Sequence, residues 1–470
     1  MSRPTLALAL LLVFVWSTPS HAAKSEIGSP RLMQGPMVGA VTPSEIAVWV
    51  RTSGPFECWL EFGETESLSD RRATEKVMAS KENDYCVTLR MTGLKPGTRY
   101  YYRVFVHQAE GSGFANLPAF HAATAPGGPA KFRVSMGSCL RWREDRTQPI
   151  WQVVEGLRPD LFFWVGDNIY GDTLDPDILA EEYARQRELP LMQRFLNTTP
   201  QLAIWDDHDY GLNDHDRTNP IKEEALEVFK RYWPNPGYGQ PETPGVFFHY
   251  HYGGVDFFFL DGRYHRDPND MPDSPEKTFL GKEQLAWLKA GLKASQSPFK
   301  VLVCGSGFNS GKGPGGDSWA SALHERDALF DYIRDEAIGG VLLLSGDTHV
   351  GELNAIPWSQ RGGYDLYELV SSPMAQSPSG DNVARTPEMR VRPVFVEAPN
   401  AGVIDFDLTL EDPTVSLTNV DVYGLYTWEP VIVHASELRN GVASAKNKQN
   451  AAARQMETFS RGGAKALEKR

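Results

Sequence analysis

The sequence has few cysteines and few positive charges for its length, and each scarcity excludes a class of protein. Four cysteines in 470 residues are too few for a fold held together by disulfides. The 60 aspartates and glutamates outnumber the 47 lysines and arginines, giving a formal net charge of -13. This balance argues against general nucleic-acid binding, which usually needs a basic surface. It is compatible with a site rich in carboxylates that holds cations.

Long hydrophobic runs are also scarce. An apolar stretch, Leu6–Trp16, follows Arg3, and small residues at Ser20 and Ala22 suit a signal peptidase. We therefore expect a signal peptide over residues 1–22 and a secreted, periplasmic or extracellular protein. A single early arginine excludes a twin-arginine signal and favours the general secretory route. No later apolar run reaches the ~20 residues that span a bilayer, so we expect no transmembrane segment.

The first part of the mature chain is rich in short alternating strands. Strands separated by proline, glycine and serine turns predict a small antiparallel β-sandwich over residues 30–124. Its stretch GLKPGTRYYYRV (Gly93–Val104) resembles the turn and following strand of fibronectin type III domains. A linker rich in glycine and proline follows at Ala123–Lys131. Cys58 and Cys86 lie in this domain and could pair, so their state stays open.

Beyond the linker, apolar runs alternate with segments of helical periodicity. The runs include FRVSMGSC, DLFFWVGD, LAIWDDHD, VDFFFLDGR, FKVLVCGS and GVLLLSGDTH. Strands this apolar are buried on both faces, which predicts a layered α/β domain over residues 131–434. Residues 435–470 contain few large apolar side chains and are basic, so they form either a disordered tail or a helix laid over the acidic body.

Residues that can bind metal ions follow four of the predicted strands: Cys139; Asp167 and Tyr170; Asp206, Asp207, His208 and Asp209; and Asp347 and His349. Each alone has an ordinary explanation as a small core residue, a turn residue or a buried histidine. Ligands bind at the carboxyl ends of strands in open α/β sheets, so four such ends together favour one shared site. Thiolate, phenolate and imidazole suit a transition metal such as iron, whereas grouped carboxylates suit calcium or magnesium.

These strand ends carry motifs that resemble those of PhoD-like alkaline phosphatases, which belong to the calcineurin-like metallophosphoesterase superfamily. The motifs are GSC (Gly137–Cys139), VGDNIYGD (Val165–Asp172), WDDHD (Trp205–Asp209) and SGDTH (Ser345–His349). They occur in the family's order. The resemblance implies a layered α/β/β/α metallophosphoesterase domain behind the β-sandwich. It also implies a monomeric phosphoesterase that hydrolyses small phosphate esters by in-line attack of a metal-bound hydroxide.

The resemblance also assigns metal ligands. One ferric ion would be held by Cys139, Asp167, Tyr170 and His349. Asp167 would bridge to one or two calcium ions that Asp207 and Asp347 also bind, and Asp206 is a further candidate ligand. The superfamily commonly adds a metal-binding histidine after a later strand, where this chain offers Cys304, Ser306 and Asn309.

His208 would contact the phosphate and act as general acid for the leaving oxygen, beside Asp207. Arg141 is a candidate phosphate contact, although an exposed surface arginine is an equally good interpretation. Four further residues are candidate calcium ligands or simple turn residues: Asp172, Asn213, Asp214 and Asp216. The aromatic residues of GRYHRD are assigned to the core.

Two other functions remain open from the sequence. The same metals would serve a phosphodiesterase or phospholipase D-type hydrolase, because selectivity lies in the pocket walls. A non-catalytic, calcium-stabilised surface-binding protein is the other alternative. The presence of both His208 and Cys139 disfavours it.

Overall fold

The computed structural model describes residues 29–107, 119–313, 315–380 and 386–449. The predicted signal peptide at residues 1–22 lies outside this part of the chain, as do residues 450–470. Among the described helices, none has both the length and the apolar character needed to cross a membrane.

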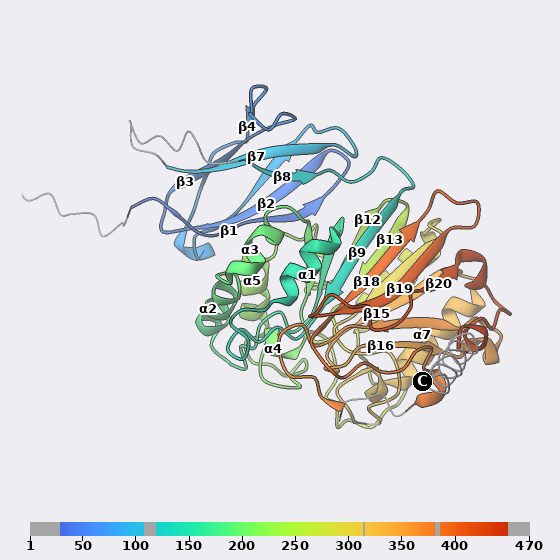
Figure 1. The fold of residues 1–470 in the computed structure, drawn as a ribbon. Coiled ribbons are helices and arrows are strands. Elements are labelled where there is room, and N and C mark those ends of the chain that lie inside the picture. The colour runs from blue at the N-terminus through green and yellow to red at the C-terminus, as the bar shows by residue number, and fades with distance from the viewer. Residues whose placement is uncertain (1–28, 108–118, 314, 381–385, 450–470) are drawn as a thin grey trace, which may run out of the picture.

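Two small antiparallel sheets form the N-terminal part of the fold (Figure 1). Their strands are β1 (Leu32–Val41), β2 (Glu45–Thr52) and β6 (Cys86–Thr92) in one sheet, and β3 (Glu57–Gly63), β4 (Arg72–Ala73), β5 (Val77–Met78), β7 (Arg99–Val106) and β8 (Phe120–Ala123) in the other. Buried and partly exposed residues alternate along β3, as expected for a strand with one face in a core. Cys58 on β3 and Cys86 on β6 are free, buried thiols in different sheets. The predicted antiparallel N-terminal sheets are confirmed.

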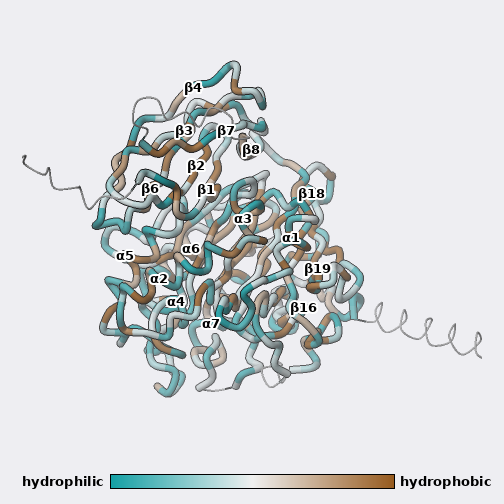
Figure 2. The backbone as a smooth tube through the Cα atoms, turned by 60° about the vertical axis from the view of Figure 1, so that its left-hand side comes forward, coloured by the Kyte–Doolittle hydropathy of each residue, from teal (hydrophilic) through white to brown (hydrophobic). Residues whose placement is uncertain are grey.

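Two six-stranded sheets form the body. In spatial order, the first contains β11 (Gln201–Ile204), β10 (Leu161–Val165), β9 (Lys131–Gly137), β18 (Asn400–Asp407), β19 (Thr414–Asp421) and β20 (Val431–His434). The second contains β12 (Phe248–Tyr252), β13 (Val255–Phe259), β14 (Phe299–Val303), β15 (Val341–Ser345), β17 (Leu366–Val370) and β16 (Glu352–Ile356). Hydrophobic stretches, brown in Figure 2, run through β1 and β2 and through the interior of the body.

Alternate residues of β10 explain how the layers stack. The ring of Phe163 lies 5.0 Å from that of Phe257 on β13, so one face of the first sheet packs against the second sheet. The next residue, Trp164, turns to the other face, where its ring lies 5.0 Å from that of Trp151 on α1. Both faces are therefore buried, which is why the strand reads as an uninterrupted apolar run.

Helices cover the outer faces of both sheets: α1 (Ile150–Leu157), α2 (Pro176–Gln186), α3 (Pro190–Leu196), α4 (Asp207–Tyr210), α5 (Lys222–Tyr232), α6 (Lys282–Ala294) and α7 (Leu323–Asp335). On the second sheet, Trp287 of α6 packs against Phe258 of β13 with ring centroids 6.0 Å apart. The layering is α/β/β/α, which confirms the predicted fold class.

The N-terminal sheets and the first part of the C-terminal segment both pack on the body. The indole nitrogen of Trp49 on β2 donates to the carbonyl oxygen of Arg231 on α5 at 2.7 Å. The Ser444 hydroxyl lies 2.8 Å from the Tyr367 hydroxyl. The described C-terminal residues up to Gln449 thus lie against the body.

Parallel pairing aligns the strand ends that carry the motifs. β10 pairs in parallel with both β9 and β11, and β14 does so with both β13 and β15. The two sheets therefore present their carboxyl ends along one edge of the body, which places the motif loops side by side.

Candidate active site

Glycines at the strand ends allow the loops to approach each other closely. A Cβ atom on Gly166, which has a φ of +85°, would lie 2.6 Å from the Cβ of Asp206. A Cβ on Gly346 would lie 2.4 Å from the hydroxyl of Ser138. These separations are too short for packed atoms, so glycine is required before Asp167 and before Asp347.

Four candidate ligands have a left-handed backbone. The φ angles are +58° at Cys139, +49° at Asp167, +67° at Asp347 and +56° at His349. This conformation is unfavourable for residues with a Cβ, and such strain tends to gather at functional sites. Tertiary hydrogen bonds maintain it; for example, the His349 amide donates to the Ser372 hydroxyl at 3.0 Å.

The thiol, carboxylate, phenol and imidazole predicted to bind iron lie together. Cys139 Sγ and Tyr170 Oη lie 3.3 Å and 3.4 Å from Asp167 Oδ2, and Tyr170 Oη lies 3.3 Å from His349 Nε2. Ligands of one transition-metal ion, each about 2.0–2.3 Å from it, have similar separations. The other oxygen of Asp167, Oδ1, is buried and has no hydrogen-bond partner among the described residues. This donor set fits a transition-metal ion.

Burial explains why this group of side chains needs a cation. It raises the pKa of the Cys139 thiol to about 11 and raises the pKa values of Tyr170 and Asp167 well above their usual range. It also lowers the pKa of His349, which favours the neutral, metal-binding imidazole. A bound cation would offset the cost of ionising the thiol, phenol and carboxylate.

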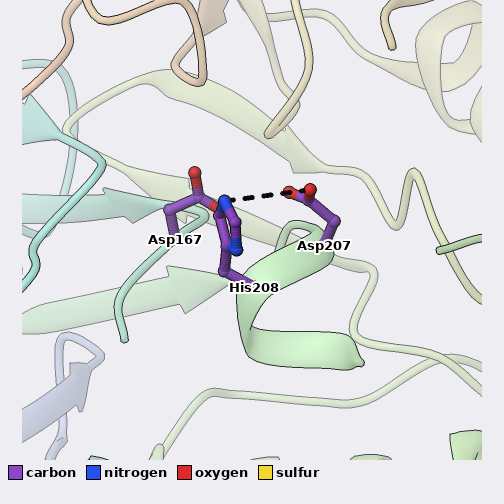
Figure 3. Close-up of side chains that lie close together, drawn as sticks. All are labelled: Asp167, Asp207 and His208. Atoms are coloured by element: carbon purple, nitrogen blue, oxygen red, sulfur yellow. Dashed lines mark ion pairs between the residues drawn. The ribbon is translucent and has the colours of Figure 1, made fainter. Parts of the chain in front are cut away.

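Carboxylates from several loops form a second group beside the first. Oxygen atoms within 4.8 Å of one another come from Asp206, Asp317 and Asp347, and also from Asp207, Asp214 and Asp317. A further cluster links Asp207 to Asp167 through His208, and Figure 3 shows the imidazole between the two carboxylates. Oxygen-only groups of this kind suit a hard cation such as calcium.

Two cationic side chains of the protein, Arg263 and Lys312, compensate much of this negative charge. Neither was predicted from the sequence. Arg263 is fully buried; its guanidinium lies 2.6 Å from Asp317 and 3.5 Å from Asp207, and it also pairs with Asp206. Burial opposes ionisation of Asp207, but Arg263, His208 and the backbone amide of Asp214 together outweigh it and lower the pKa of that carboxyl. The Lys312 ammonium pairs with Asp347. Arg263 belongs to the GRYHRD stretch, of which only the aromatic residues were assigned to the core, and its position after β13 was the available signal.

His208 lies at the edge of the site and has a defined partner. One ring nitrogen, Nδ1, contacts the carboxylate of Asp172, and the ring centroid lies 4.1 Å from that of Tyr170. Nε2 lies 4.0 Å from Asp207 Oδ2. Burial alone would lower the pKa of His208, but Asp167 and Asp172 outweigh it and raise that pKa to about 10. These carboxylates favour the protonated form of His208.

Arg141 lies at the mouth of the site. Its guanidinium is 5.1 Å from the Tyr170 ring centroid and pairs with Glu144 at 3.1 Å, with 40% of the side chain exposed. Gln376, which belongs to none of the sequence motifs, also reaches the site. Its amide nitrogen lies 2.6 Å from Tyr170 Oη and contacts His349.

Other candidates have structural partners instead. The Asp209 carboxylate accepts from the backbone amides of Asn168 and Asp206, and so ties two motif loops together. Ser306 bonds to Asp206, whereas Asn309 bonds to Glu368 at 3.1 Å. Cys304 is buried in the core, and Asp214 belongs to the carboxylate group. The Asp216 carboxylate accepts from the backbone amide of Thr218 and so closes a turn.

The family follows from comparison with known proteins. The sequence model described as PhoD-like phosphatase matches residues 134–412, and the one described as PhoD-like phosphatase, N-terminal domain, matches residues 18–118. The chain belongs to the PhoD-like phosphatase family. The resemblance inferred from the four motifs is confirmed, and both six-stranded sheets of this PhoD-like chain lie largely within the first match.

Individual relatives agree with this assignment. Alkaline phosphatase D of Bacillus subtilis (strain 168) is 25% identical over 332 residues, which are 59% of this chain and 55% of that protein. This PhoD-like chain thus spans about half the length of the curated relative. A solved structure of PhoD has a TM-score of 0.69 at 17% identity, covering 90% of this chain and 97% of that one. A purple acid phosphatase from yellow lupin (Lupinus luteus) seeds has a TM-score of 0.58 at 13% identity, covering 86% and 74%. Both structures share the metallophosphoesterase-like fold.

Proposed function

We propose that the protein is an exported, metal-dependent hydrolase of small phosphate esters. The observation that carries this proposal is the convergence of a thiol, a phenol, an imidazole and a carboxylate at one strand edge, beside a second group of carboxylates. Cys139, Asp167, Tyr170 and His349 would hold one ferric ion. Asp207 and Asp347 would hold one or two calcium ions together with Asp167.

When bound, these cations supply charge that activates a water molecule and stabilises the phosphoryl oxygens. Side chains of the protein supply the proton and bind the substrate. His208 donates a proton to the leaving oxygen, because the carboxylate of Asp172 on Nδ1 stabilises the protonated imidazole. Arg141, partly exposed above Tyr170, is placed to bind a phosphoryl oxygen of the substrate.

The proposal is tested by elemental analysis of the purified protein together with assays on a chromogenic phosphate monoester and a chromogenic diester. We expect bound iron and calcium and hydrolysis of at least one ester. The ratio of the two rates distinguishes a monoesterase from a diesterase or phospholipase D-type enzyme. Neither metal and no hydrolysis would overturn the proposal.

The Asp172→Asn variant tests how His208 is positioned. Asp172 stabilises the imidazolium, so its loss should lower the pKa of His208 and expose the neutral ring at lower pH. We expect kcat to fall about tenfold at pH 8, and the alkaline limb of the kcat profile to move to lower pH. Asp175→Asn is the control, because Asp175 only caps α2. A profile that coincides with the wild type would contradict the role of Asp172.

The Tyr170→Phe variant tests the iron site by absorption. Phenolate bound to ferric iron gives a coloured protein, so removing the hydroxyl should abolish the visible band. The ring of phenylalanine keeps the stacking on His208, so the fold should be retained. The visible spectrum and iron content are measured on the same sample. A visible band that persists in an iron-loaded variant would exclude Tyr170 as a ligand.

A further inference from the structure

Away from the candidate active site, a polar cavity lies between the N-terminal sheets and the body. It has a volume of about 400 Å³, within the usual range for small-molecule sites. Arg99 and His121 line it from the N-terminal side, and Arg158 and Arg194 line it from the body. Arg99 and His121 belong to β7 and β8, and the hydroxyl of Tyr102 on β7 donates to the carbonyl oxygen of Asn197, the residue after α3, at 2.7 Å.

Two of its arginines, Arg99 and Arg158, are exposed and have no ion-pair partner among the described residues. The two acidic residues of the lining differ: Glu155 pairs with Arg194 at 2.9 Å, whereas the Asp160 carboxylate accepts the uncharged backbone amide of Arg133 at 2.8 Å. Within the described residues, the guanidinium groups of Arg99 and Arg158 make no hydrogen bond or ion pair. Two free guanidinium groups on one cavity stand out in a chain whose net charge is -13.

The positive charge of these arginines affects the pKa of the neighbouring His121. Burial lowers the pKa of His121, and the charges of Arg99 and Arg194 lower it further. His121 therefore stays neutral and offers one N–H donor. Guanidinium groups form paired, charge-assisted hydrogen bonds with phosphate, for which their planar shape is well suited.

The cavity is separate from the catalytic edge. Asp160 precedes the first residue of β10, whereas Asp167 follows the last residue of that strand. Seven residues of extended chain separate them by on the order of 20 Å. A ligand in the cavity would contact both parts of the fold without touching the metal-binding loops.

We propose that this cavity binds a small phosphate-bearing anion and that Arg99 and Arg158 are its principal contacts. The bound anion bridges the N-terminal sheets and the body. Because it binds only the folded arrangement of the two parts, it stabilises the native protein by an amount that rises with the logarithm of its concentration once this exceeds Kd.

The test uses the full-length protein, inorganic phosphate as the probe and isothermal titration calorimetry. In the wild type we expect two classes of phosphate site, since the catalytic edge also binds this anion. In Arg99→Gln/Arg158→Gln we expect one class to be lost or weakened at least about fivefold, with the inhibition constant of phosphate against a chromogenic monoester unchanged. Inorganic phosphate and a long-chain polyphosphate are compared, because tighter binding of the chain would identify a polymeric source.

The matched control is Arg71→Gln/Lys76→Gln, which removes the same charge from exposed side chains on the same sheet. An unchanged titration in Arg99→Gln/Arg158→Gln would overturn the proposal, as would an equal loss in the control. If the wild type hydrolyses no ester but Arg99→Gln/Arg158→Gln still loses one class of phosphate site, only the catalytic proposal is refuted. Thermal unfolding with and without phosphate shows whether each variant is folded.

Discussion

The His208→Ala variant is expected to lower kcat on a phosphate monoester by about 10²–10⁴-fold while leaving the bound metal nearly unchanged. The imidazole lies between Asp167 and Asp207, and it is not one of the four side chains proposed to hold iron. Its Nδ1 is occupied by Asp172, so Nε2 is the atom available to the leaving oxygen.

This result is checked by steady-state kinetics and elemental analysis on one preparation. The loss should be smaller for an ester with a good leaving group, because such a group departs without a proton. His324→Ala is the control, since His324 is 53% exposed and pairs only with Asp273. Wild-type turnover in His208→Ala would refute the assigned role, and parallel loss of metal and activity would make His208 a ligand.

The Asp167→Asn variant is expected to have the largest effect on metal binding. Asp167 contacts both Cys139 and Tyr170, and it also belongs to the cluster with Asp207. Loss of a residue that only supports a ligand costs roughly 10–100-fold in metal affinity, so loss of a shared ligand should cost more. We expect iron and calcium to be lost together, with turnover reduced at least about 100-fold.

Measuring the unfolding temperature distinguishes loss of metal binding in Asp167→Asn from misfolding. Because burial raises the pKa of Asp167, the metal-depleted folded protein binds a proton that the unfolded chain releases, so this carboxyl lowers stability increasingly as pH rises above its pKa in the unfolded chain. Asparagine removes that charge at nearly constant volume. After chelation, Asp167→Asn should therefore unfold at the same temperature as the wild type or higher. Asp216→Asn is the control, and full metal content in Asp167→Asn would contradict the bridging role.

Most of the candidate metal ligands could be predicted from the sequence because they follow one local rule. A buried strand of a parallel sheet reads as an apolar run, and the residue that follows it lies at the edge where ligands bind. Cys139, Asp167 and Asp347 each occupy such a position, and Tyr170 and His349 lie within three residues of one. The structure brings these side chains to one edge.

The side chains that balance the charge of the carboxylates could not be predicted from the sequence by the same rule. Arg263 also follows a strand and is fully buried, yet only the aromatic residues of the GRYHRD stretch were considered in the sequence. Lys312 and Gln376 belong to no motif and reach the site from long loops. The histidine expected near Cys304 is absent, and Lys312 supplies a cation to the same carboxylate group.

The layered fold, the family and the candidate ligands follow from the order of the residues, because hydrophobic periodicity and strand-end motifs are local properties of the chain. Three features required the folded arrangement: which carboxylates face a cation from the protein, the contact of Asp172 with His208, and the cavity that two unpaired arginines share between the two parts of the fold. Electrostatic pairing depends on distance in space and on burial. Residues such as Asp206 and Arg263 lie far apart in the sequence, and the sequence pattern does not specify that distance.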